Sequence, residues 1–317
     1  MRRFLLLFVF LILGSFWLPS SVQAAVCSIS TDTVVNQTYV TDNACTSINI
    51  EGNVSTTWIG TVDLGGGTVT VKTGYTMTMG TSSEMILGAA DDFVVEANAT
   101  TTHTAADANG LKITARNITV VGALSANGKG CFGSLGETLQ GYGPSLTTGA
   151  CTYGASGAGK SGGGAGGGGS GGAYGGTSGA APGGGVAVTA VYGDGLNPTL
   201  LGSGGGQGYY LYSYGGAGGG RIVLRSLGVL EVSGSISANG NNGSPADLGH
   251  LNGAGGGSGG TVVITAAAIS GSGSISANGG LGGGSVGAIG NIDASTKTIT
   301  YKADGTIFLQ DNEGLYP

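Results

Sequence analysis

The sequence predicts an all-β protein, a parallel β-helix or solenoid with glycine-rich, extended loops of the polyglycine II type. Three observations predict this class: short runs of alternating apolar residues, a segment that occurs three times, and glycine concentrated in one part of the chain. Of the 70 glycines, 10 precede residue 121. Hydrophobic residues make up 40% and charged residues 9% of the chain, so an apolar core can form.

The first part of the mature chain contains runs of four to six alternating residues, separated by small or polar turn residues. Each run predicts a short strand, and the close spacing is typical of all-β folds. No amphipathic helix is predicted after the leader. The predicted strand segments are residues 67–73, 75–81, 83–89, 92–97, 111–115 and 117–123.

Three similar segments begin at Leu111, Arg221 and Thr261. In each, an alternating strand and a second apolar strand precede an aliphatic residue and the letters SANG. A strand that cannot bury its own apolar face is stabilised by stacking successive copies, so the repeat predicts a solenoid. We expect a strand-rich start at residues 25–120, then a glycine-rich β-helix at 121–317 that carries an inserted loop at 129–220.

The aliphatic residues before SANG are Leu124, Ile236 and Ile275, and the asparagines within it are Asn127, Asn239 and Asn278. Asparagine tolerates left-handed backbone angles and can stack in a ladder along a solenoid axis. We favour this structural role for the three asparagines over a binding role.

Glycine runs such as GGGAGGGGSGGAYGG, GSGGGQG, GGAGGGR and GAGGGSGG lie between these segments. They fit either flexible linkers or extended left-handed helices with three residues per turn, whose bare faces allow close packing and mutual backbone hydrogen bonds. The second interpretation is favoured because the runs recur at corresponding places beside the repeated strands.

With these units of SANGG followed by a glycine run and an alternating strand, residues 111–290 resemble secreted glycine-rich repeat proteins, mostly of bacteria. The resemblance implies a β-helix with glycine-rich loops and work at a surface or outside the cell, and it implies no reaction. Similar polyglycine packing is used in phage tail-tip adhesins and in the glycine-rich ectodomain of a receptor tyrosine kinase family.

Residues 1–24 are identified as a secretory signal peptide, with a basic start, an apolar stretch and small residues before the cleavage site. A membrane anchor is the alternative, but the apolar stretch is shorter than the roughly 20 residues needed. No later segment is apolar enough to span a membrane. Secretion favours disulfides, and of the three possible connectivities we favour Cys27 with Cys45 and Cys131 with Cys151, each bond worth about 3 kcal/mol.

The formal net charge of −6 makes nucleic acid an improbable partner class. Residues 154–161, GASGAGKS, match a phosphate-binding pattern, but neither a buried strand nor a helix flanks them, so no nucleotide is predicted. His103 and His250 are far apart and the cysteines are widely spaced, which argues against a metal site. No cofactor is predicted.

A polysaccharide-active enzyme on a β-helix would need clustered carboxylates. The acidic residues here are scattered, and two groups of charged residues are interpreted as solvated surface charge. They are Asp91 with Asp92, and Glu231 with Arg221 and Arg225. Asp247 and His250 lie together in a polar segment without a second acid or nucleophile.

Four tyrosines lie within six residues flanked by glycine: Tyr209, Tyr210, Tyr212 and Tyr214. Tyrosine offers a large amphipathic contact area at low entropic cost, which suits binding to a glycan or a protein surface. Packing against the solenoid is the alternative. Tyr142, Tyr153, Tyr174 and Tyr192 could extend the same surface. The sequence therefore predicts a secreted or cell-surface, non-enzymatic adhesive or structural protein, with a secreted polysaccharide lyase or hydrolase as the alternative.

Overall fold

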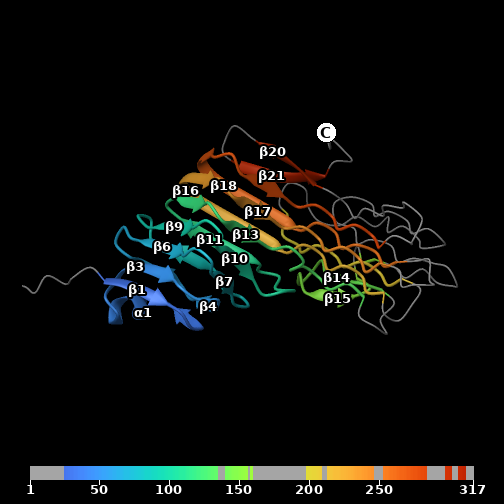
Figure 1. Cartoon of the computed structure of the whole chain (residues 1–317), viewed down its shortest axis with the longest axis horizontal. Helices are drawn as coiled ribbons and strands as arrows, with labels where there is room; N and C mark the ends of the chain where they lie inside the picture. Colours follow the sequence, from blue (N-terminus) through green and yellow to red (C-terminus); the bar gives the residue numbers. More distant parts are fainter. Residues whose placement is uncertain are drawn as a thin grey trace, which may run out of the picture.

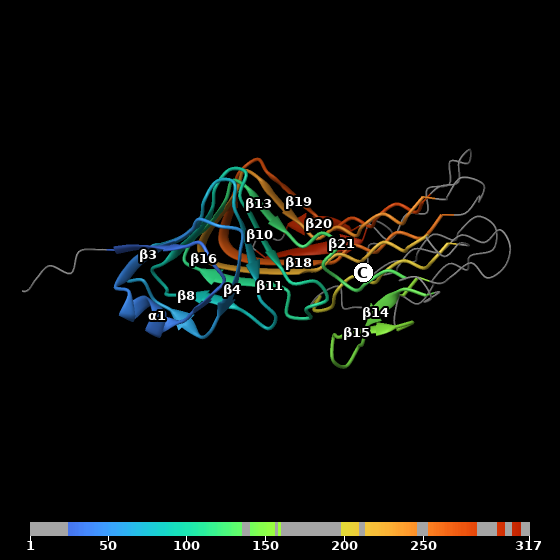
Figure 2. The same cartoon turned by 60° about the horizontal axis from the view of Figure 1, so that its bottom comes forward.

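The chain forms a parallel β-solenoid in this computed structural model, with the glycine-rich segments extending from one side (Figures 1 and 2). The structure describes residues 25–134, 140–155, 158–159, 198–208, 213–245, 253–283, 297–301 and 306–311.

Two curled sheets build the solenoid, and within it the neighbouring strands pair in parallel. The seven-stranded sheet contains β2 (Thr33–Val35), β4 (Val54–Trp58), β7 (Thr76–Met79), β10 (Thr100–His103), β13 (Ala123–Ser125), β17 (Ser235–Ser237) and β19 (Ser274–Ser276). The twelve-stranded sheet contains β1 (Ala25–Ile29), β3 (Cys45–Ile50), β5 (Thr61–Val62), β6 (Thr68–Val71), β8 (Met85–Leu87), β9 (Asp92–Val95), β11 (Leu111–Ala115), β12 (Ile118–Val120), β16 (Arg221–Val232), β18 (Thr261–Ser270), β20 (Lys297–Tyr301) and β21 (Thr306–Asp311).

Each turn of the solenoid passes through one strand of the seven-stranded sheet and then through two short strands of the larger sheet, as in β7, β8 and β9. Later turns fuse the two short strands into one long strand. Thus β16 pairs with β11 through residues 222–226 and with β12 through residues 230–232. Between Ser226 and Val229 the long strand passes from the half that pairs with β11 to the half that pairs with β12, and the register of its pairing with β18 shifts there.

The core is a set of side-chain columns that run along the solenoid axis, because alternate residues of each strand point inward. In one column Met77 pairs in register with Thr101, and Leu124 pairs with Thr101 on the other side. The column continues through Ile236 to Ile275. The aliphatic residues before SANG therefore occupy equivalent positions in successive turns.

The asparagine ladder is confirmed as well. The amide N–H of Asn239 donates to Oδ1 of Asn127 at 2.7 Å, and the N–H of Asn278 donates to Oδ1 of Asn239 at 2.7 Å. These bonds connect three successive turns at the same corner, where the chain leaves the seven-stranded sheet for the glycine-rich segments.

The six predicted strand segments contain β6, β7, β8, β9, β11 and β12. The sequence predicts no amphipathic helix after the leader, and the structure contains one short helix there, α1 (Gln37–Asp42), which buries Val40. The side chain of Asn36 caps it by accepting from the N–H of Tyr39 at 2.8 Å, which compensates for the low helix propensity of this threonine-containing segment. Strand β10 had no prediction because its threonines show no alternation of apolar and polar residues.

Both predicted disulfides are present, Cys27 with Cys45 and Cys131 with Cys151. The first joins β1 to β3 at the beginning of the solenoid. The second lies in the predicted insertion of residues 129–220, which falls between β13 and β16. At the other end of the solenoid, β21 pairs antiparallel with β18 and β20 pairs antiparallel with β21. In the part of the chain that the structure describes, no helix has the length and apolar character needed to cross a membrane.

The described glycine-rich segments are hydrogen-bonded to one another through their backbones. Gly202 and Gly205 donate to Gly219 and Gly216, and the two pairs are three residues apart on each segment. The same step separates the donors of another pair of segments, residues 254–260 and 238–244. Their bonds run from Ala254 to Ser244, from Gly257 to Asn241 and from Gly260 to Ala238.

A three-residue step is what packed extended segments with three residues per turn require. Described glycine segments such as 202–205 and 216–219 are therefore tied to neighbours rather than hanging as independent linkers. Their assignment as polyglycine II helices stays a prediction. The glycine run at residues 162–176 lies outside the described residues.

Candidate functional site

A small antiparallel hairpin lies beside the glycine-rich segments, formed by β14 (Tyr142–Pro144) and β15 (Cys151–Tyr153). Figure 2 shows it below those segments, apart from the two sheets of the solenoid. The disulfide between Cys131 and Cys151 ties the hairpin to the segment that leaves the solenoid after β13, with the two Cα atoms 5.3 Å apart.

Three aromatic side chains from these two segments meet at the hairpin. The ring centroids of Phe132 and Tyr142 are 6.4 Å apart at 90°, and those of Tyr142 and Tyr153 are 5.7 Å apart at 70°. Both are edge-to-face arrangements, which aromatic rings prefer. Phe132 is 41% exposed and Tyr153 46% exposed, so the cluster presents ring surface to solvent. We call Phe132, Tyr142 and Tyr153 the aromatic surface.

The backbone holds the aromatic surface in place. The N–H of Tyr142 donates to the carbonyl oxygen of Phe132 at 2.9 Å, and the N–H of Gly204 donates to the carbonyl oxygen of Tyr142 at 2.8 Å. A β-carbon on Gly204 would clash with the carbonyl oxygen of Phe132. The glycine therefore allows the close approach that fixes the ring-bearing segment.

Of the four clustered tyrosines that the sequence singled out, Tyr209, Tyr210 and Tyr212 lie outside the described residues. Tyr214 is described and is exposed. The N–H of the following residue, Gly215, donates to Oγ of Ser134 at 2.9 Å, so Tyr214 lies on a segment adjacent to the one that carries Phe132.

The structure brings together Tyr142 and Tyr153, which the sequence offered only as an extension of the tyrosine cluster. Phe132 was missed, because nothing in a sequence shows which rings a disulfide will bring together. Its position next to Cys131, half of a predicted disulfide, was the available signal. Tyr174 and Tyr192 lie outside the described residues, as do Asp247 and His250.

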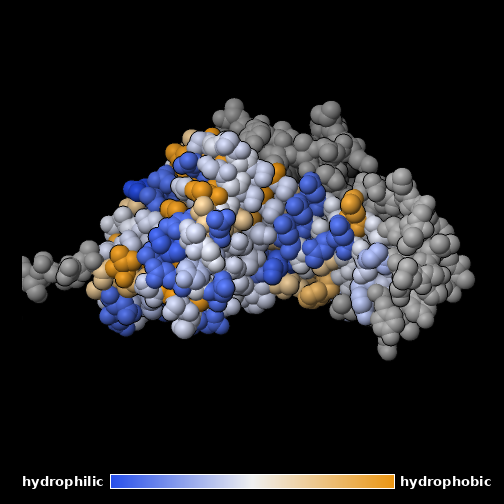
Figure 3. Space-filling view, viewed as in Figure 1, coloured by the Kyte–Doolittle hydropathy of each residue, from blue (hydrophilic) through white to orange (hydrophobic). Residues whose placement is uncertain are grey.

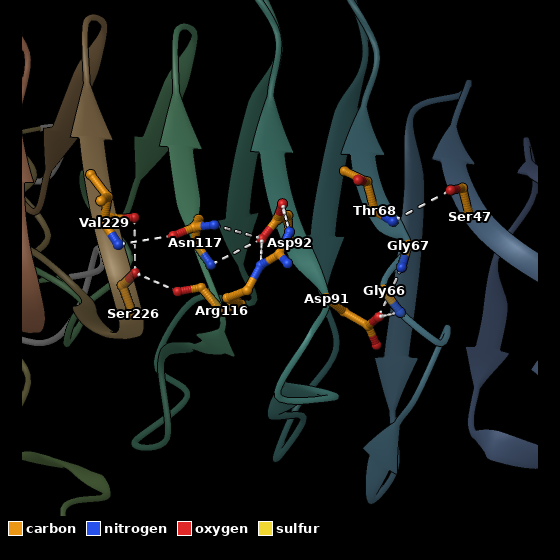
Figure 4. Close-up of polar contacts among 10 residues, drawn as sticks. All are labelled: Ser47, Gly66, Gly67, Thr68, Asp91, Asp92, Arg116, Asn117, Ser226 and Val229. Carbon is orange, nitrogen blue, oxygen red and sulfur yellow. Dashed lines mark hydrogen bonds and ion pairs between the residues drawn. The ribbon is translucent and has the colours of Figure 1, made fainter.

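The paired carboxylates Asp91 and Asp92 lie on the larger sheet, where their hydrogen bonds are used for structure (Figure 4). The interpretation of Asp91 as solvated surface charge is wrong, since its side chain is fully buried. Its carboxylate accepts from the backbone N–H groups of Leu64, Gly66 and Gly67 at 2.7, 2.7 and 2.9 Å. Because residues 64–67 form a bend rather than a strand, their N–H groups need a partner, and Asp91 supplies it.

Asp92 points the other way and forms a salt bridge with Arg116 of the next turn. Two hydrogen bonds from the guanidinium, at 2.9 and 2.6 Å, lower the pKa of Asp92 below its usual value. Asn117 also donates to this carboxylate and accepts from the N–H of Val229 on the turn beyond, at 3.0 and 2.9 Å. This chain of contacts connects three turns of the solenoid, which Figure 4 shows as a row across the strands.

Arg225 and Glu231 are both exposed on β16 but do not form one group. Arg225 lies in the half of the strand that pairs with β11, and Glu231 lies in the half that pairs with β12. The bend between these halves places them on different faces. Within the described ranges, the histidine, cysteine and acidic side chains form no cluster of three that could hold a metal ion.

No family model, curated protein or solved structure matches this chain.

Proposed function

We propose that this chain is a secreted or cell-surface protein without enzymatic activity, which adheres to a glycan or a protein surface through the aromatic surface. The observation that carries the proposal is the edge-to-face cluster of Phe132, Tyr142 and Tyr153, exposed to solvent at the hairpin. Exposed aromatic groups on a rigid support are typical of recognition surfaces, because little conformational entropy is lost when a partner binds.

The extracellular location rests on two kinds of support. The structure contains two disulfides, which form and persist in oxidising compartments. The first 24 residues have the pattern of a secretory leader. Tyr214 lies on the neighbouring segment and would extend the same contact surface.

The proposal is tested by replacing Phe132, Tyr142 and Tyr153 with serine and measuring binding to a glycan array and to whole cells. We expect binding to fall by at least about tenfold, since hot-spot aromatic residues typically contribute 2 kcal/mol or more each. The matched control is Tyr75→Ser, because Tyr75 is an exposed tyrosine on the solenoid itself. Circular dichroism and the melting temperature of each variant report whether the fold is kept.

Unchanged binding by a folded triple variant would contradict the proposed site. A second variant, with Tyr209, Tyr210, Tyr212 and Tyr214 replaced by serine, separates the two parts of the surface. Release of reducing ends or unsaturated products from a panel of glycans would instead support the alternative, a secreted lyase or hydrolase, and would overturn the non-enzymatic proposal.

A further inference from the structure

The outward face of the seven-stranded sheet carries two columns of small hydroxyl side chains. Residues that alternate with the buried core positions point outward, and in this sheet nearly all of them are threonine or serine. The inner column contains Ser55, Thr78, Thr102, Ser125, Ser237 and Ser276, and the outer column contains Thr76, Thr100, Ala123, Ser235 and Ser274. We call these two columns the hydroxyl face.

The columns form a regular two-dimensional grid. Adjacent strands of a sheet lie about 4.8 Å apart, and alternate residues of a parallel strand lie about 6.6 Å apart. The pairings from β4 to β19 run in parallel without a register shift, and β10 pairs with β13 through the outer column at Thr100 and Ala123. Strands β7 and β10 each contribute a Thr-x-Thr pair, and strands β17 and β19 each contribute a Ser-x-Ser pair.

The hydroxyls of this grid are not used by the protein. In the described part of the chain, the side chains of both columns hydrogen-bond neither to one another nor to any other group, although a hydroxyl can donate one bond and accept two. Thr102 is only 8% exposed, and its Oγ1 is buried without a partner. Thr102 lies beside Thr78 of β7 in the inner column. The hydroxyls of the more exposed members of both columns are therefore available to a ligand that supplies hydrogen bonds.

The character of the face indicates what that ligand is. The two columns hold neither a charged nor an aromatic side chain. In Figure 1, β7, β10, β13 and β17 lie side by side toward the viewer, and Figure 3 shows a large pale area there, neither strongly hydrophilic nor strongly hydrophobic. A glycan-binding site usually combines stacking rings with polar groups, as the aromatic surface could, and the columns of this face hold no rings.

A grid that repeats in two directions is complementary to a ligand that also repeats in two directions. Water molecules bridge hydroxyls at nearly the enthalpy of direct hydrogen bonds, and the grid would hold them at regular positions while the threonine methyl groups lie between them. We infer that the hydroxyl face orders a layer of water and binds the surface of ice crystals, whose lattice oxygens repeat at comparable spacings. This activity is separate from adhesion through the aromatic surface.

The experiment freezes a dilute solution of the mature protein slowly onto a cold probe and measures the protein in the ice fraction and in the liquid. Thermal hysteresis and inhibition of ice recrystallisation are measured on the same samples. We expect enrichment in ice by at least about fivefold over a non-binding protein of similar size. Thr78→Lys places a long charged side chain in the inner column, and we expect it to abolish the enrichment.

The matched control is Thr70→Lys. Thr70 is also an outward, half-buried threonine in a central strand, but it lies on β6 of the larger sheet between Asn49 and Val94. The control should keep the full enrichment. If Thr78→Lys alters the circular dichroism spectrum, Thr76→Lys in the outer column takes its place.

Three outcomes would overturn the inference: no enrichment of the wild-type protein, full enrichment of a folded Thr78→Lys variant, or equal loss in Thr70→Lys. Binding to crystalline cellulose or chitin in place of ice, with loss in Thr78→Lys, would assign the face to a solid polysaccharide and would also overturn it. Replacing the aromatic surface with serine should leave ice enrichment unchanged, so failure of one proposal is distinguishable from failure of the other.

Discussion

Replacing Gly219 with alanine tests whether the glycine-rich segments are packed. The N–H of Gly219 donates to the carbonyl oxygen of Ser258 at 2.8 Å, and its own carbonyl oxygen accepts from the N–H of Gly202 at 2.8 Å. A β-carbon on Gly219 would overlap the carbonyl oxygen of Ala238, and it would lie 2.5 Å from the backbone nitrogen of Gly260. Neighbouring stretches of backbone therefore surround a position that has no room for a methyl group.

The magnitude follows from two opposing effects. Overpacking a close-packed site costs about 1–3 kcal/mol, and the upper end applies because the obstacle is backbone. Alanine also lowers the entropy of the unfolded chain relative to glycine, which stabilises the fold by roughly 0.4–1 kcal/mol. We therefore expect Gly219→Ala to lower the free energy of unfolding by about 2 kcal/mol, which corresponds to roughly 4–8 °C in melting temperature.

Urea unfolding and a thermal melt of the mature protein measure this change, with Gly80→Ala as the matched control. At Gly80 the nearest obstacle is the hydroxyl of Thr57 at 2.8 Å, which can rotate away, and the next atom is 3.5 Å distant. The control should be neutral or slightly stabilising. A neutral Gly219→Ala would refute the packed arrangement, and so would immediate hydrogen exchange of the amides of Gly202 and Gly216.

Three further predictions concern the solenoid. Burial lowers the pKa of His103 from 6.5 to about 4, so the contribution of its neutral form to stability is complete above pH 6.5 and is lost as the pH falls to about 4. The free energy of unfolding falls by about 3 kcal/mol over this range. His103→Asn should remove this part of the pH dependence, measured by urea titrations at pH 7 and 4.5. Asp91→Asn should cost about 2–3 kcal/mol, because an amide cannot accept from every backbone N–H that the buried carboxylate satisfies; Asp92→Asn, which weakens a surface salt bridge, should show a much smaller loss in the same assay. Asn239→Ala should lower the melting temperature by a few degrees through the loss of one ladder bond of about 1 kcal/mol, and an unchanged melting temperature would show that the ladder does not stabilise the corner.

Much of the solenoid could be predicted from local sequence alone. Alternating apolar residues identified strands such as β6 and β7, because a strand of period two needs the same residue type at every second position. The repeated SANG placed Leu124, Ile236 and Ile275 at equivalent core positions, since stacked turns reuse the same side-chain environment. Cysteine spacing favoured, among three possible connectivities, the pairing that the structure shows.

The candidate surfaces depended on tertiary structure. The sequence indicated a cluster at residues 209–214, whereas the described rings that meet are Phe132, Tyr142 and Tyr153, joined by a disulfide and a hairpin rather than by proximity in the chain. The hydroxyl face also depended on tertiary structure, because the register between neighbouring strands decides which side chains line up in a column. Each strand shows only one to three small hydroxyl residues, and a threonine or serine at every second position is common in exposed strands.

The sequence by itself therefore determined which residues form strands, which of them point to the core and which cysteines pair, because each of these depends on spacing along the chain. Only the tertiary structure decided that Asp91 is buried beneath a glycine bend, that glycine segments far apart in sequence exchange hydrogen bonds, and that hydroxyls from six strands align in columns. The physical reason is that contacts between turns depend on how successive turns stack. The long insertion between the first two repeats separates stacked strands in the sequence, so a local pattern cannot show which of them are neighbours.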